Sequence, residues 1–192
     1  MLEVEYEATF TNIDKNTVRE LLRSAGAKLV RAEFLQRRSV FHLPSGHEIS
    51  GGWLRVRDEG DRITMSLKIV DGDKIEDQKE LSITVDDYAN TKVFLESIGA
   101  SCKSYQETKR ELWILDGTEI AIDEWPYLEP FVEIEGDSEE SVRMATEKIG
   151  FDYSEAVFCQ VSTLFARKYG IEENAFNDQT PLLTFESDNP FI

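Results

Sequence analysis

The sequence has few residues of the types on which several common kinds of site depend. Only two histidines, His42 and His47, and two cysteines, Cys102 and Cys159, occur among its 192 residues. Two histidines offer few candidates for the ligands of a zinc site or for the base of a Ser/His nucleophile. Two cysteines are too few for a disulfide framework. If the protein uses a metal, carboxylates must hold it, and carboxylate oxygens favour Mg²⁺ or Mn²⁺.

Long apolar runs are also missing. No stretch approaches the roughly 18 consecutive apolar residues that indicate a membrane-spanning helix. The chain also does not start with a basic segment followed by a short apolar run, as a secretory leader would. We therefore expect a cytoplasmic protein with no membrane partner, in which both cysteines are reduced.

Basic residues are scarce relative to acidic ones. The chain carries 21 Lys and Arg against 38 Asp and Glu, a formal net charge of −17. A field of this sign repels nucleic acid polymers and anionic lipid surfaces, so any anionic ligand must meet a local basic pocket. The hydrophobic content of 41% is enough for the core of one sizeable domain.

Alternating patterns predict a sheet with about eight strands. Extended segments are indicated at residues 3–10, 28–43, 78–85, 101–115, 119–125 and 130–136, and a hairpin that turns at Glu59-Gly60-Asp61 is indicated at residues 51–74. Helical spacing with caps is found at residues 12–27, 86–100, 138–151 and 154–171. We expect one domain over residues 1–170 and an irregular tail over residues 171–192.

Charged and apolar residues alternate on most of these strands, with acidic side chains on the first and last strands and basic ones on the middle strands. A sheet with one solvated polar face would give this pattern, and so would a closed barrel with a charged interior. In a barrel the first strand lies near the last, so four glutamates would converge as a site for a hard cation. Arginines and a lysine on the other walls would bind successive phosphates.

Four motifs together resemble the CYTH domain family, the triphosphate tunnel metalloenzymes that include class IV adenylate cyclases and thiamine triphosphatases. These motifs are EYEATF at the first strand, WLRVR, SLK, and FVEIEG at the last strand, and their order agrees over roughly residues 1 to 170. The resemblance implies an α+β fold, a closed eight-stranded antiparallel barrel surrounded by helices, with a triphosphate and a divalent metal inside.

The resemblance also implies roles for particular residues. The metal ligands it implies are Glu5, Glu7, Glu133 and Glu135, with Asp123 as a further candidate, and the phosphate-binding residues are Arg55, Arg57 and Lys68. In QETKREL the basic role falls on Lys109 or Arg110, and strand parity favours Lys109 as the inward residue. In the second strand either Arg37 or Arg38 faces the interior, and Arg38 is the candidate. Glu80 is the candidate for orienting or deprotonating water, so Glu5, Glu7 and Glu80 are the predicted catalytic residues.

Two positions depart from the family pattern, since Thr9 stands where the first motif would end in lysine and Ser82 where a second glutamate would follow Glu80. The expected activity is metal-dependent hydrolysis of a triphosphate, with inorganic triphosphate as the preferred substrate. Two alternatives stay open: a cyclase that forms cyclic AMP from ATP, and a protein that binds a nucleotide or polyphosphate without turnover. We expect a monomer or a homodimer.

Overall fold

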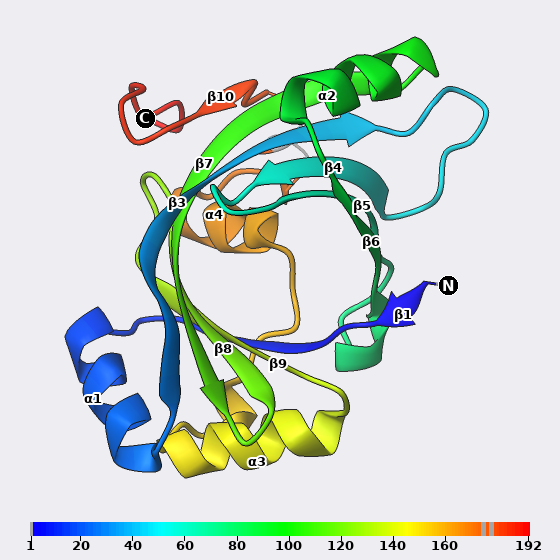
Figure 1. The fold of residues 1–192 in the computed structure, drawn as a ribbon. Coiled ribbons are helices and arrows are strands. Elements are labelled where there is room, and N and C mark those ends of the chain that lie inside the picture. Colours follow the sequence, from blue (N-terminus) through cyan, green and yellow to red (C-terminus); the bar gives the residue numbers. More distant parts are fainter. Residues whose placement is uncertain (1, 174–175, 177–178) are drawn as a thin grey trace.

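The computed structural model describes residues 2–173, 176 and 179–192 of the chain. Its centre is a sheet that curves almost into a closed barrel, with helices arranged around it (Figure 1). The helices are α1 (Lys15–Ala25), α2 (Tyr88–Ser97), α3 (Glu139–Ile149) and α4 (Val161–Tyr169). The strands are β1 (Glu3–Val4), β2 (Tyr6–Phe10), β3 (Lys28–His42), β4 (Gly52–Asp58), β5 (Ile63–Val70), β6 (Gln78–Val85), β7 (Ser101–Leu115), β8 (Thr118–Glu124), β9 (Phe131–Gly136) and β10 (Leu182–Leu183). The α+β barrel predicted from the sequence is confirmed.

The first strand closes the barrel by joining both edges of the sheet. The strand order is β1-β6-β5-β4-β3-β7-β8-β9-β2, and these neighbours pair antiparallel. Eight strands were predicted and nine lie along this path, because the first predicted strand is divided at Glu5 into β1 and β2. The backbone N–H of Glu5 donates to the carbonyl of Gln78 at 2.9 Å, so the chain stays bonded to β6 where it crosses between the edges.

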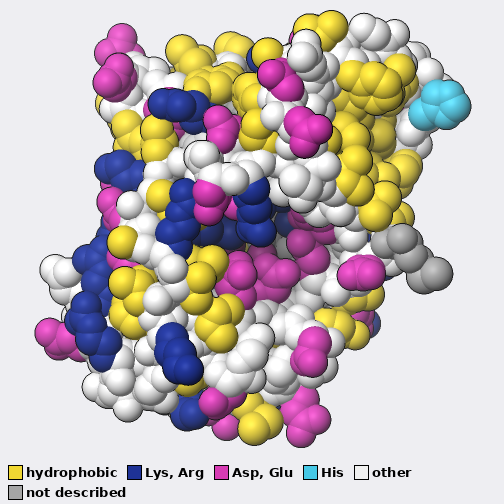
Figure 2. Space-filling model, in the orientation of Figure 1, with side chains coloured by type: hydrophobic (Ala, Val, Ile, Leu, Met, Phe, Trp, Pro, Cys, Tyr) yellow, Lys and Arg dark blue, Asp and Glu magenta, His cyan; other side chains and the backbone are white. Residues whose placement is uncertain are grey.

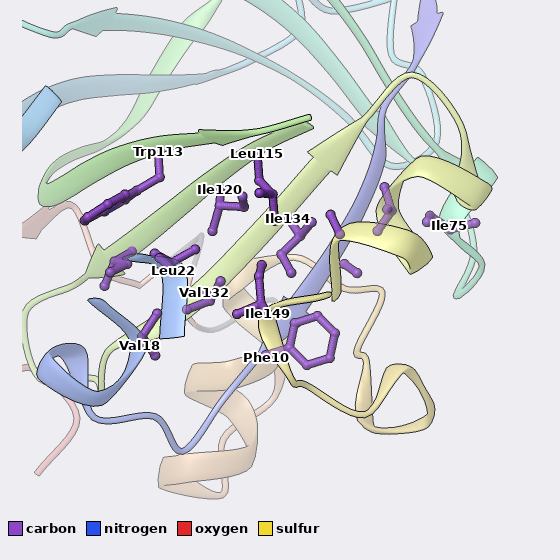
Figure 3. Close-up of a cluster of buried hydrophobic side chains, with 14 residues drawn as sticks. Phe10, Val18, Leu22, Ile75, Trp113, Leu115, Ile120, Val132, Ile134 and Ile149 are labelled. Atoms are coloured by element: carbon purple, nitrogen blue, oxygen red, sulfur yellow. The ribbon is translucent and has the colours of Figure 1, made fainter. Parts of the chain in front are cut away.

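Helices α1 and α3 cover the outside of β2, β8 and β9. The side chain of Asp14 accepts a hydrogen bond from the N–H of Thr17 at the start of α1, and Gly26 ends the helix in the left-handed conformation. Val18 and Leu22 then face the sheet and are buried. Figure 3 shows labelled side chains of the strands and of both helices pointing into this common core. Because this core lies outside the barrel, the inward-facing side chains are free to be polar.

Smaller apolar clusters secure the rest of the chain. Leu95 of α2 packs with Phe41 of β3 and Val56 of β4. Near α4, Phe165 and Leu183 are fully buried in an aromatic cluster, and β10 pairs parallel with β7. The described part of the predicted tail is therefore packed against the barrel, while residues 174, 175, 177 and 178 of that prediction lie outside the described residues. None of the described helices is long and apolar enough to cross a bilayer.

Candidate functional site

The interior of the barrel is a cavity of about 890 Å³. Figure 2 shows it as a hollow with basic side chains along one side and acidic side chains along the other. All the predicted site residues except Lys109 line it, namely Glu5, Glu7, Arg38, Arg55, Arg57, Lys68, Glu80, Arg110, Asp123, Glu133 and Glu135. The fold therefore brings together side chains that are up to 130 positions apart in the sequence (135 minus 5).

The acidic side is formed where β2 meets β9. In this antiparallel pair Glu7 lies opposite Glu135, and Thr9 lies opposite Glu133. Burial, together with repulsion from Glu133, raises the pKa of Glu7 well above its ordinary value. Burial and the neighbouring Asp123 raise the pKa of Glu133 to about 7. These carboxyl groups are gathered without enough positive charge to keep them all ionised.

The chemistry of these donors fits a hard divalent cation. Oxygen ligands from several carboxylates are what Mg²⁺ and Mn²⁺ require, and a cation would relieve the repulsion that raises the pKa values of Glu7 and Glu133. Within the described ranges, no three Asp, Glu, His or Cys side chains already surround a common point as metal ligands.

On the opposite side, β4, β5 and β6 carry a compact group of ion pairs. Arg55 Nη2 lies 3.1 Å from each carboxylate oxygen of Glu80, and Lys68 Nζ lies 3.0 Å from Glu80 and 2.8 Å from Glu5. Although burial opposes ionisation, the charges of Arg55 and Lys68 lower the pKa of Glu80. A carboxylate held ionised by two cations is a weak base, so this geometry favours Glu80 as a support for Arg55 and Lys68.

The prediction that Lys109 faces the interior is wrong, and Arg110 takes that position. Lys109 Nζ lies 3.3 Å from Glu124 outside the cavity, whereas Arg110 donates to Asp123 at 2.8 Å and to Glu133 at 2.5 Å. Parity favours Lys109 because the apolar residues Leu112 and Ile114 share a face of the strand with Arg110. Leu112 in fact lines the cavity, and it is Trp113, on the opposite parity, that packs into the outer core.

Glu59 is a site residue that the sequence did not reveal. It is only 3% exposed, lies 2.7 Å from Nε of Arg57 and 2.5 Å from Nε of Arg62, and lines the cavity. Burial and the nearby Arg55 lower the pKa of Arg57 to about 10. The sequence does contain a signal for Glu59. It lies two residues after Arg57, so an extended chain places it on the same face as Arg55 and Arg57.

Arg38 differs from the other interior cations because its hydrogen-bond partners are uncharged, although the charge of Asp123 also acts on it. It donates to Gln36 at 2.9 Å and to Thr108, and its guanidinium lies 4.7 Å from the ring centre of Trp125. Among the described residues it forms no ion pair, and its buried Nε–H has no hydrogen-bond partner. A buried guanidinium in this condition is suited to an anionic ligand.

The two departures from the family pattern lie in different settings. Ser82 lines the cavity. Thr9 is 3% exposed and does not line it, and Thr9 exchanges both backbone hydrogen bonds with Val157. Glu133 lies opposite Thr9, and the cation that pairs with it is Arg110 on β7.

Comparison with known families agrees with this geometry. A family model for the CYTH domain matches residues 1–164. The chain belongs to the CYTH domain family. No curated protein matches the sequence.

Solved structures share the fold of this CYTH domain. A putative adenylate cyclase of Vibrio parahaemolyticus is 10% identical, with 86% of this chain and 99% of that chain covered and a TM-score of 0.72. A conserved hypothetical protein of Pyrococcus furiosus is 18% identical over 83% and 99% of the two chains, with a TM-score of 0.68. A putative adenylyl cyclase of Hippeastrum with a dominant triphosphatase activity is 14% identical over 90% and 97%, with a TM-score of 0.58. At these identities the similarity is one of fold.

Proposed function

We propose that this CYTH domain hydrolyses a triphosphate, with inorganic triphosphate as the preferred substrate, in a reaction that depends on Mg²⁺ or Mn²⁺. The observation that carries the proposal is a single cavity with carboxylates on one side and guanidinium and ammonium groups on the other. A linear triphosphate needs cations along its length, and the carboxylates would hold a divalent metal that adds positive charge beside it. Inorganic triphosphate is preferred because the sequence motifs supply groups for phosphates and a metal and none for a base.

The roles of the side chains follow from their positions. Glu5, Glu7, Glu133 and Glu135 would hold the metal, with Asp123 beside them. When bound there, a divalent cation would supply positive charge near the phosphate oxygens and would make water a better nucleophile. Arg38, Arg55, Arg57, Lys68 and Arg110 would bind phosphate oxygens and stabilise the charge that develops on them. Water adds to the terminal phosphorus and the P–O bond to the remaining diphosphate breaks, so the products are phosphate and pyrophosphate.

The test is release of phosphate from inorganic triphosphate with Mg²⁺ or Mn²⁺, followed beside a Glu7→Gln variant. We expect Glu7→Gln to reduce turnover by about 100-fold, because the amide removes a negative ligand at the metal and leaves the shape of the side chain. Glu147→Gln, an exposed glutamate on α3, is the matched control and should retain turnover. Equal activity of Glu7→Gln and the native protein would contradict the proposal. ATP run in parallel, with cyclic AMP measured, separates hydrolysis from cyclisation.

A second candidate is a protein that binds triphosphate without cleaving it, and Thr9 is the observation that favours it. The hydroxyl side chain replaces the lysine of the family motif and contributes no charge to the cavity. Tight metal-dependent binding without product would support this candidate. Turnover that appears only in Thr9→Lys would then identify the missing cation as the cause.

A further inference from the structure

The C-terminal segment reaches the cavity although it lies outside the part of the chain that matches the family. The match ends at residue 164, and Phe176, twelve residues later (176 minus 164), is among the side chains that line the cavity. Phe176 is 1% exposed, so it is fully packed in this position. A side chain from beyond the matched residues therefore forms part of the cavity lining.

Phe176 connects to the cations through a short series of aromatic contacts. Its ring is stacked on Phe165 of α4, with the ring centres 4.5 Å apart, and tilted against Trp125, with the centres 6.3 Å apart. Trp125 also meets Phe165 edge to face, with the ring centres 6.3 Å apart, and the guanidinium of Arg38 lies 4.7 Å from the centre of its ring. Trp125 follows β8 with the same parity as Asp123, so its indole lies inside the barrel between the segment and Arg38.

Arg38 depends on this support more than the other cations do. Arg55, Lys68 and Arg110 are each held in place by carboxylates, whereas the described partners of Arg38 are Gln36, Thr108 and the indole. Stacking on an aromatic face fixes the plane of a guanidinium and leaves its charge uncompensated. A carboxylate partner would fix Arg38 equally well, but it would compete with a phosphate for the same N–H groups.

We propose that Phe176 is a positioning residue of the triphosphate site, which holds Trp125 so that its indole orients Arg38 toward the anionic ligand. This inference rests on the proposed binding of a triphosphate in the cavity. It assigns a role in binding to a segment that the family domain does not include. Phe176 acts through Trp125 and Arg38 and does not need to touch the phosphates itself.

The first experiment compares Phe176→Ala with Phe191→Ala by calorimetric titration of the full-length protein with inorganic triphosphate and Mg²⁺. Phe191 belongs to the same aromatic cluster and packs on Phe165 and Phe176, but no ring contact joins it to Trp125. We expect Phe176→Ala to weaken binding about fivefold and Phe191→Ala to change it less than twofold, while both lower the melting temperature. Equal losses of affinity in the two variants would overturn the proposal. If Phe176→Ala does not fold, Phe176→Leu is used with the same criterion.

A double-mutant cycle then tests whether the effect passes through Arg38. Lysine at position 38 keeps the charge but cannot stack its plane on the indole. In an Arg38→Lys background we expect Phe176→Ala to have no further effect on the affinity. A fivefold loss that persists in this background would show that Phe176 acts by another route and would overturn the proposal.

A measurement without ligand separates failure of this inference from failure of the proposed function. The Nε–H nitrogen resonance of Arg38 reports its surroundings in the free protein and is assigned with Arg38→Lys. We expect Phe176→Ala to shift or broaden that signal and Phe191→Ala to leave it unchanged. If the native protein binds no triphosphate, the proposed function fails and this signal alone decides on the positioning of Arg38. An unchanged signal in Phe176→Ala would refute the positioning.

Discussion

Two carboxyl groups that contact the same arginine differ in acidity. Arg110 donates two hydrogen bonds to Asp123, and although burial opposes ionisation this lowers the pKa of Asp123. Glu133 also contacts Arg110, but burial and the charge of Asp123 dominate and raise its pKa to about 7. Adjacent groups with opposite shifts are typical of sites where protons or metals are exchanged. The pair therefore predicts how stability depends on pH.

Without metal, the free energy of unfolding should fall as the pH rises from 5 to 8. The folded protein retains a proton on Glu133 up to about pH 7, whereas the unfolded chain loses it near the ordinary value of 4.5. The proton is thus bound mainly by the folded state in this window, and its loss removes about 2 kcal/mol of stability. Urea unfolding in EDTA measures this slope. Glu133→Gln has no proton to lose and should reduce the slope, leaving the part due to Glu7, whose pKa is also raised, while an unchanged slope would contradict the assignment.

At the scale of elements, the turn that leads into β4 depends on a glycine packed against the end of β5. Gly51 has φ of +65°, and a Cβ there would lie 2.0 Å from the carbonyl oxygen of Val70. Gly46, in the same connection, has φ of +82° and open space around it. We expect Gly46→Ala to cost about 1 kcal/mol of backbone strain, and Gly51→Ala to cost about 2 kcal/mol more, because β4 must move from β5. Urea unfolding of both variants checks this, and equal costs would refute the packing argument.

The strand pattern predicted a sheet of about eight strands and was compatible with an open sheet or a barrel, and the resemblance to the CYTH family implied the barrel. Alternation also placed most of the interior side chains, because Arg55 and Arg57 share one face of their strand. Alternation failed on β7, where both faces are apolar near the end of the strand: Leu112 lines the cavity, and Trp113 packs with α1 and α3. Periodicity cannot distinguish two buried faces. It also could not place Phe176, because the tail has no sustained period and reaches Trp125 only through tertiary packing.

For the whole molecule, the formal charge of −17 opposes the approach of a triphosphate, while the cavity holds the cations that would bind it. These two effects act over different distances. The Debye length is about 30 Å at 0.01 M salt and about 8 Å at 0.15 M. At low salt an approaching anion therefore experiences the charge of the entire protein, and at higher salt mainly that of the cavity mouth.

The association rate constant of inorganic triphosphate should therefore rise with salt, by about threefold between 0.01 and 0.15 M NaCl, in contrast to a ligand that is steered by attraction. Stopped-flow tryptophan fluorescence can follow binding, because Trp53 and Trp125 line the cavity. Replacing the exposed Glu140 and Glu147 of α3 by lysine changes the formal charge from −17 to −13, two units for each substitution, without touching the lining. That variant should associate faster at low salt and show a smaller salt effect. A rate constant that falls with salt in the native protein would mean that the basic wall governs the approach as well as the binding.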